Sequence, residues 1–165
     1  MRSLKDMNAD GLLLCKLQAK VFEKSVSQCD TSSAIFIRRF MNSRVAEMID
    51  SGYLLQSVVS PTEIIQLVEE EYRYSNYGST KYNSEEMYWI GYIYRYFSYT
   101  YELSSHRVYK IVKPKELHEI YLPYHTLSPS QAIERILEAK GMLLDEEAEL
   151  MRQFVIFKQI RNQRF

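Results

Sequence analysis

Side chains able to bind a metal ion are few in this chain, and they are widely spaced. The three histidines are His106, His118 and His125, and no two of them have the spacing that places two ligands on one helical turn. Cys15 and Cys29 are the only cysteines, and neither belongs to a CxxC pair. The sequence therefore predicts no zinc or iron centre, and we expect no cofactor.

Glycine-rich loops and nucleophile motifs are also missing from the sequence. A backbone that cradles phosphate needs clustered glycines, and the five glycines here are isolated from one another. The chain has no G-x-S-x-G motif, and Cys29 lies in a polar segment without a histidine near it in sequence. The sequence thus gives no sign of nucleotide binding or of nucleophilic catalysis.

Acidic residues are clustered at positions 69–71, 85–86 and 146–147. Paired carboxylates are the groups that general acid–base catalysis uses. Each cluster, however, lies at an expected helix start or on a charged face, where water solvates the carboxylates. We therefore expect that the protein is not an enzyme. An enzyme acting on a nucleotide or a modified protein is the least favoured alternative.

Basic residues form two local groups along the chain. Arg38, Arg39 and Arg44 make up the first, and residues 106–115 contain the second, in which cations are interleaved with Tyr109. Such groups bind phosphate or an acidic partner, although an ordinary solvated helix face has the same composition. The chain carries 21 basic and 21 acidic residues, and this balance counts against a general nucleic-acid-binding protein.

The densest aromatic segment of the chain runs from Ser84 to Leu103. Tyr92, Tyr94 and Tyr96 alternate at a spacing of two, which favours a β-strand. The whole segment is far longer than a usual strand of about 5–6 residues, so we favour a helix. On a helix the polar residues fall in one narrow arc, which indicates a central helix enclosed on most sides. The arc consists of Gly91, Arg95, Ser98 and Glu102.

This aromatic helix supplies both the expected core and several candidate contact residues. Tyr88, Tyr92 and Tyr99 share one face with Tyr96, and we expect that face in the core. The residues expected at the centre of the core are Trp89, Ile93, Tyr96 and Phe97. Tyrosines nearer the edge of the polar arc are the ones that a partner would meet. The candidate partner-binding residues are Arg38, Arg39, Tyr94, Arg95 and Tyr101.

Capping residues divide the rest of the chain into further helices. Ser60 and Ser128 each precede a proline at the first helical position, with Glu63 and Gln131 three residues after the caps. Asn83 begins the aromatic helix, and Asn8 or Asp10 begins the first one. The expected helix starts lie near positions 8–10, 34, 60, 83, 114, 128 and 145, and a short further helix can start at 104–105.

These elements predict one compact all-α domain over residues 1–165, a bundle of about six or seven helices around the central aromatic helix. Residues 1–31 supply an N-terminal helix, and residues 142–165 supply a C-terminal helix at the periphery. No window has the roughly 20 apolar residues of a membrane span. Two cysteines without a recognisable signal sequence indicate reduced thiols and a cytoplasmic location.

Three stretches of the sequence resemble a known group of proteins. They are Ile35–Ser43 (IFIRRFMNS), Tyr88–Tyr96 (YWIGYIYRY), and Tyr109–Pro114 (YKIVKP) leading to Leu122–Leu127 (LPYHTL). Together they resemble small bacterial proteins, common in Gram-positive gut bacteria, that are labelled antitoxins of toxin–antitoxin pairs. The likeness covers about residues 32–139.

The resemblance implies a cytoplasmic antitoxin that binds a cognate protein toxin and covers its active site. The toxins associated with this group include ADP-ribosyltransferase-like proteins. No active-site residue is carried over to this chain by the resemblance. A DNA-binding transcriptional regulator that uses the region of Arg38, Arg39 and Arg44 is the main alternative. No clear helix-turn-helix is visible, so a nucleic-acid partner is less favoured.

Overall fold

The computed structural model describes residues 2–56, 59–142 and 146–163. Its elements are α1 (Ala9–Gln28), α2 (Ser33–Met41), α3 (Arg44–Asp50), the 3-10 helix η1 (Tyr53–Gln56), α4 (Pro61–Tyr72), α5 (Ser84–Tyr101), α6 (Ser105–Ile111), α7 (Pro114–Tyr124), α8 (Pro129–Ala139) and α9 (Glu146–Gln163). The described residues contain no strand, which confirms the all-α prediction. They form nine α-helices, more than the six or seven predicted.

Ser43 is one reason for the larger number of helices, because the helix expected from position 34 divides there into α2 and α3. The Ser43 hydroxyl donates to the carbonyl oxygen of Phe40 at 2.6 Å. The same Oγ accepts a hydrogen bond from the backbone N–H of Ala46 at 3.2 Å. A single side chain thus binds the last turn of one helix and caps the start of the next.

Side-chain caps at other helix starts agree with those expected from the sequence. Asn8, Ser60, Asn83 and Ser128 each accept a hydrogen bond from the backbone N–H three residues further on, at 2.8–3.3 Å. Proline occupies the first turn of α4, α7 and α8, where its missing N–H costs no helical hydrogen bond. These helix starts are therefore determined by residues close to them in sequence.

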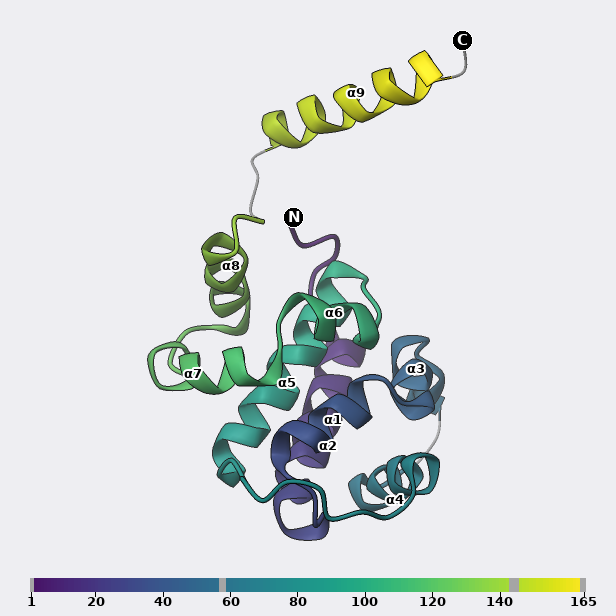
Figure 1. Cartoon of the computed structure of the whole chain (residues 1–165), viewed down its shortest axis with the longest axis vertical. Helices are drawn as coiled ribbons and strands as arrows, with labels where there is room; N and C mark the ends of the chain where they lie inside the picture. The colour runs from purple at the N-terminus through teal and green to yellow at the C-terminus, as the bar shows by residue number, and fades with distance from the viewer. Residues whose placement is uncertain (1, 57–58, 143–145, 164–165) are drawn as a thin grey trace.

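The central helix α5 packs along α1 in the middle of the molecule (Figure 1). Gly91 lies at their contact, where a β-carbon would be 2.8 Å from the carbonyl oxygen of Gln18 and 2.8 Å from Cγ of Phe22. The two backbones approach so closely only because position 91 has no side chain. Gly91, which the sequence places on a polar arc, is thus a packing residue.

Apolar side chains from most of the helices form the core around α5. Ile93 and Phe97 are buried, as predicted for the centre of the core. Trp89 and Tyr96 are only half-buried, so their predicted central position is wrong. The physical reason lies on the other side of α5, where Arg95 faces inward and turns the aromatic side toward the surface.

Residues 73–83, which are rich in Tyr, Ser, Asn and Gly, connect α4 to α5 without regular structure. The connection is held against the start of α2. The backbone N–H of Ser33 donates to the carbonyl oxygen of Thr80 at 3.0 Å. The Ser33 hydroxyl oxygen in turn accepts from the backbone N–H of Tyr82 at 2.9 Å.

The C-terminal helix α9 extends away from the body formed by the other helices (Figure 1). Several of its described side chains are large, apolar and exposed. They are Phe154, Val155, Ile156, Phe157 and Ile160. Within the described residues, no helix combines the length and the apolar character that crossing a membrane requires.

Candidate functional site

Three of the five candidate contact residues lie inside the protein. Tyr94, Arg95 and Tyr101 have 0%, 1% and 6% of their surface exposed. The prediction that these three meet a partner is therefore wrong, because the face of α5 that carries them points into the core. The Tyr94 hydroxyl donates to the carbonyl oxygen of Val112 at 2.8 Å, and burial raises the pKa of this tyrosine well above its ordinary value.

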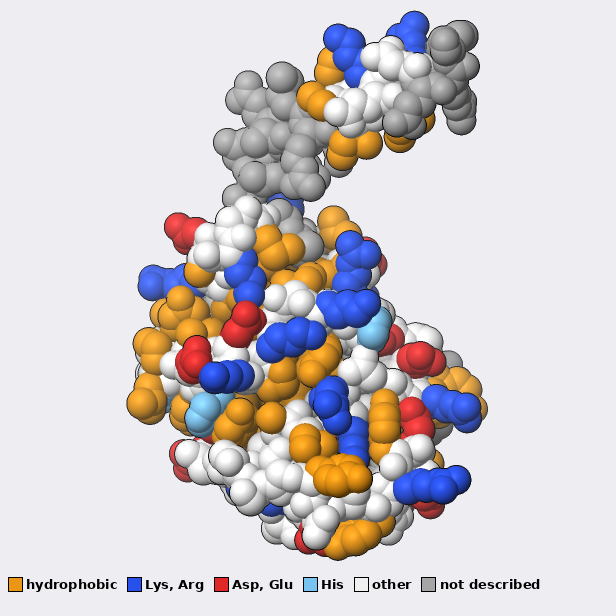
Figure 2. Space-filling view, viewed as in Figure 1, with side chains coloured by type: hydrophobic (Ala, Val, Ile, Leu, Met, Phe, Trp, Pro, Cys, Tyr) orange, Lys and Arg blue, Asp and Glu red, His pale blue; other side chains and the backbone are white. Residues whose placement is uncertain are grey.

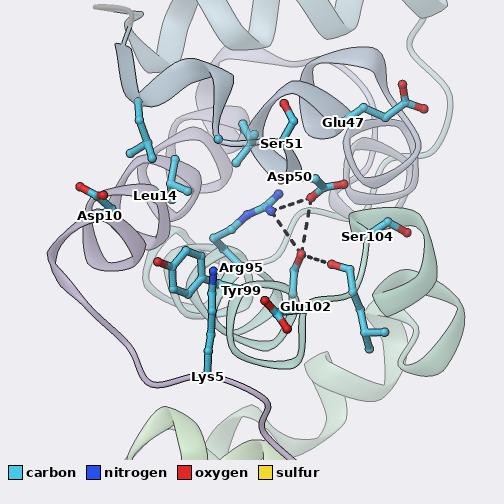
Figure 3. Close-up of a pocket in the computed structure, with 15 residues that line it drawn as sticks. Lys5, Asp10, Leu14, Glu47, Asp50, Ser51, Arg95, Tyr99, Glu102 and Ser104 are labelled. Atoms are coloured by element: carbon cyan, nitrogen blue, oxygen red, sulfur yellow. Dashed lines mark hydrogen bonds and ion pairs between the residues drawn. The ribbon is translucent and has the colours of Figure 1, made fainter.

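Arg95 is held in the interior by hydrogen bonds to three other helices. Its Nη1 donates to Oδ1 of Asp50 on α3 at 2.6 Å (Figure 3). Its Nε donates to Oε1 of Gln18 on α1 at 2.8 Å, and its Nη2 donates to Oγ of Ser105 on α6 at 2.7 Å. Burial lowers the pKa of Arg95, and the charge of Asp50 opposes that effect. The planar guanidinium can be buried because its donors meet acceptors and its charge is paired.

The carboxylate of Asp50 is the second half of this network. It accepts a hydrogen bond from the backbone N–H of Ser105 at 2.9 Å and another from the Ser105 hydroxyl at 2.6 Å. The network therefore fixes α1, α3 and the start of α6 around α5. Sequence reasoning missed Asp50, because it lies 45 positions from Arg95 and no local pattern connects the two.

A cavity of about 620 Å³ opens beside this network (Figure 3). Three further carboxylates line it, from Asp10, Glu47 and Glu102. Lys5 also lines it, with Nζ 3.7 Å from the centre of the Tyr99 ring. The lining contains no histidine or cysteine, and no cluster suited to a metal ion occurs in the part of the chain that the structure describes. We assign the network beside this cavity to the stability of the fold.

His118 and Glu86 form another polar pair, which joins α7 to the start of α5. Nδ1 of His118 lies 2.6 Å from Oε1 of Glu86. The ring of Tyr82 stacks on the imidazole with 3.9 Å between ring centres. The Glu86 side chain is only 5% exposed, whereas that of His118 is 45% exposed. The buried carboxylate therefore orients the partly exposed imidazole ring. The pair contributes contacts between helices that are distant in sequence.

Both cysteine thiols are free and buried. Burial raises the pKa of Cys15 and of Cys29 to about 12. A thiol with so high a pKa is protonated at neutral pH, and the protonated form is a poor nucleophile and a poor metal ligand. The two thiols therefore behave as small apolar core groups.

The two basic groups that are separate in the sequence lie side by side in the structure. Helix α2 packs against α6, and Nδ1 of His106 is hydrogen-bonded to Oδ1 of Asn42. Arg38 is exposed on α2. Burial raises the pKa of Tyr109 on α6, and the nearby charge of Arg38 acts to lower it. Lys and Arg side chains consequently extend across the front of the body over α6 and α2 (Figure 2).

We call this surface the basic face. It consists of Arg38, Arg39, Tyr72, Tyr109, Lys110 and Lys113. Two of its cations lie over aromatic rings: Nζ of Lys113 is 4.2 Å from the centre of the Tyr109 ring, and Cζ of Arg39 is 5.7 Å from that of Tyr72. Such contacts hold long side chains over apolar surface while their charged ends remain in water. Arg44 is not included in this face: it lines a groove with Leu67, and its backbone N–H donates to Oε1 of Glu71 at 2.8 Å.

A row of tyrosines occupies the outer side of α5. The rings of Tyr88 and Tyr92 are stacked with 6.5 Å between their centres, and those of Tyr92 and Tyr96 with 6.4 Å. All three are half-buried, so the prediction that this side of α5 is core is wrong in part. Trp89 lies next to the row and makes an edge-to-face contact with Tyr121 at 5.6 Å.

These observations define an all-helical protein with a buried charged network at its centre and cations mixed with aromatic rings on its surface. Comparisons with protein-family models, with curated proteins and with solved structures gave no match. The functional argument therefore depends on the chain's own surface chemistry and on the resemblance of its three sequence segments.

Proposed function

We propose that this protein is a bacterial antitoxin that neutralises a cognate protein toxin by binding it directly. The proposal combines the resemblance of residues 32–139 to antitoxins with the chemistry of the molecular surface. An ADP-ribosyltransferase-like protein is the class of toxin that the resemblance suggests. The cytoplasm, where such a toxin acts, is the proposed location.

The basic face is the observation that carries this proposal. Arg and Tyr are the residue types that most often dominate the energy of protein interfaces, and the face places them next to one another. Arg39 is already held over Tyr72, and Lys113 over Tyr109, before any partner arrives. Side chains that are pre-positioned in this way lose less conformational entropy on binding.

The ionisable groups of the interior favour binding over catalysis. Arg95 and Asp50 direct their hydrogen-bonding capacity at each other and at neighbouring helices. Cys15 and Cys29 are buried and protonated at neutral pH. Arg95 and Asp50 are engaged in hydrogen bonds within the fold, and the two thiols are buried in the core. This supports a protein that acts by binding.

A DNA-binding regulator is the second candidate, because the basic face brings together cations from α2 and α6. The observation that weighs against it is the acidic residue next to the face. Burial raises the pKa of Tyr72, and the charge of Glu71 adds to this effect while those of Arg38 and Arg39 oppose it. Negative charge therefore reaches the same ring as the two arginines. A phosphate backbone would meet repulsion there.

The test is co-expression with the product of the neighbouring gene. We expect the neighbour to inhibit growth when it is expressed alone, and this protein to restore growth and to co-elute with it in size-exclusion chromatography. Elution as two separate monomers, with no restoration of growth, would show that the pair is not a toxin and its antitoxin. An electrophoretic shift of the promoter DNA that weakens steeply with added salt would instead support the regulator.

A further inference from the structure

The basic face also indicates what kind of partner surface it fits. Resting on the proposed function, we infer that it binds an acidic segment of the partner protein in which Asp or Glu residues flank an apolar or aromatic side chain. The cations of the face would pair with the carboxylates, and the rings of Tyr72 and Tyr109 would contact the apolar side chain. The inference follows from how the cations are engaged in the free protein.

No side chain of the basic face forms a close ion pair with a carboxylate among the described residues, although Glu116 lies near Lys113. The ion pairs among the described residues involve Lys20, Arg95, His118 and Lys140. None of these residues belongs to the basic face. Lys113 and Arg39 contact rings, and a cation over a ring keeps N–H donors available. Four positive charges are therefore gathered on α2, on α6 and just after α6. Arg38, Lys110 and Lys113 are exposed, and Arg39 is half-buried.

The aromatic rings give the face a second requirement. Tyr72 and Tyr109 are half-buried, so each presents part of its apolar surface to a partner. A carboxylate alone would leave that apolar surface in water. A segment that carries both a carboxylate and an apolar side chain satisfies the cations and buries the rings at the same time.

The charges bordering the face distinguish an acidic protein from a nucleic acid. Glu70 and Glu71 are exposed at the end of α4, beside Tyr72. Glu116 lies beside Lys113, and its Oε2 accepts a hydrogen bond from the Lys113 backbone N–H at 2.9 Å. Duplex DNA presents a phosphate charge every ~1.7 Å along its axis and would meet these acids as it crossed the surface. Separate carboxylates at a few positions can pair with the cations and avoid them.

The direct test uses a defined probe, so it does not depend on the toxin. The probe is a 12-residue peptide rich in glutamate with one central phenylalanine, titrated into uniformly 15N-labelled protein at low salt. We expect the largest chemical-shift changes at Arg38, Lys110 and their neighbours on α2 and α6. We also expect binding to weaken as ionic strength rises, because exposed charges are screened.

Charge reversal gives the quantitative arm of this test. The double variant Arg38→Glu/Lys110→Glu should bind the peptide about tenfold more weakly or worse, as expected for close charge pairs at an interface. The matched control is Lys16→Glu, which reverses an exposed cation on α1 and should leave the affinity unchanged. Unchanged far-ultraviolet circular dichroism and melting temperature show that both variants are folded.

Two outcomes would overturn the inference. The first is a set of peptide-induced shifts that lies outside α2, α4 and α6, or equal weakening by the control variant. The second is tighter binding of a 20-base-pair DNA duplex than of the peptide under the same salt conditions. A neighbouring-gene product that fails to bind the wild type refutes the antitoxin proposal alone. A toxin that binds the double variant as tightly as the wild type refutes the basic face as its docking surface.

Discussion

The buried pair of Arg95 and Asp50 gives the sharpest prediction about stability. Asp50→Asn keeps the shape of the side chain and removes the negative charge that balances Arg95. The side chain of Arg95 is 2% exposed and that of Asp50 is 16% exposed. Breaking a buried pair by removing one partner costs about 3–5 kcal/mol, because an unpaired charge remains in the interior.

The cavity beside Asp50 sets the expected value within that range. Water from the cavity can approach position 50 and solvate part of the freed charge, which favours the lower end. We therefore expect Asp50→Asn to reduce the free energy of unfolding by about 3 kcal/mol. For a domain of this size the melting temperature should fall by about 6–12 °C, at about 2–4 °C per kcal/mol.

The measurement is urea unfolding followed by the fluorescence of Trp89, the single tryptophan of the chain, and in parallel by circular dichroism. The m-value should not change, because the same surface is exposed on unfolding. Glu23→Gln is the control: it breaks the exposed pair of Lys20 and Glu23, 3.3 Å apart, and should cost less than about 1 kcal/mol.

Two results would refute this reasoning. A loss below about 1 kcal/mol for Asp50→Asn would mean that the pair has the weight of an ordinary surface ion pair. Adding Arg95→Met to Asp50→Asn removes the unpaired charge and should restore part of the stability. A double variant that is less stable than Asp50→Asn alone would show that packing around the guanidinium matters more than its charge.

Three further predictions concern other parts of the fold. Gly91→Ala should lower the free energy of unfolding by about 1–3 kcal/mol, because its β-carbon meets the backbone of α1. Gly11→Ala should cost less in the same urea titration, since the atoms nearest to its β-carbon belong to the side chains of Met7 and Tyr99 and not to a backbone. Cys15 and Cys29, with pKa values of about 12, should resist a thiol-reactive dye at pH 8 and react fully in denaturant; rapid labelling of the folded protein would contradict their burial. Partial burial raises the pKa of Glu116, but hydrogen bonds from Lys140, the residue after α8, and from the Lys113 backbone N–H outweigh it and lower the pKa from its ordinary value. Because the folded-state pKa is lowered, this stabilisation is present above pH 4.5 and is lost as the pH falls through the folded value, so Glu116→Gln should destabilise at pH 7 and much less at pH 3.

Local signals in the sequence determined much of the fold. Ser60, Asn83 and Ser128 mark helix starts because a cap and the N–H that it binds are only three residues apart. The length of the aromatic segment distinguished a helix from a strand correctly. Asn42 and Ser43 indicate a possible break in the helix from position 34, but the sequence leaves open whether the helix continues through them; in the structure it divides there.

The orientation of α5 could not be predicted from the sequence. An arc containing Arg95 and Ser98 looks solvent-facing, because a charged side chain is rarely buried without a partner. The partner, Asp50, is far away in sequence and is recognisable only after the chain has folded. Because of this partner, Gly91, Arg95 and Ser98 of the polar arc face the interior, and only Glu102 is exposed. Tyr88, Tyr92 and Tyr96 consequently lie nearer the surface.

The surface was predicted in part. Arg38 is exposed and Arg39 is half-buried, and their contact with a partner stays a prediction. Their proximity to the second basic group depends on the packing of α2 against α6, which no spacing in the sequence indicates. Sequence composition can identify cations near tyrosines, but only tertiary structure shows that they belong to one surface.

The bonds between Ser105 and Asp50 have a consequence for mutational studies of the exterior. Ser105 is the first residue of α6, so the interior anchors the helix that displays Lys110. Asp50 contributes no group to the basic face. A change at Asp50 would nevertheless let α6 shift, and Lys110 would then be misaligned with Arg38 and Arg39 on α2. A binding defect in such a variant would therefore come from the interior of the protein. Substituting Asp50 is a way to weaken recognition without altering any group that touches the partner.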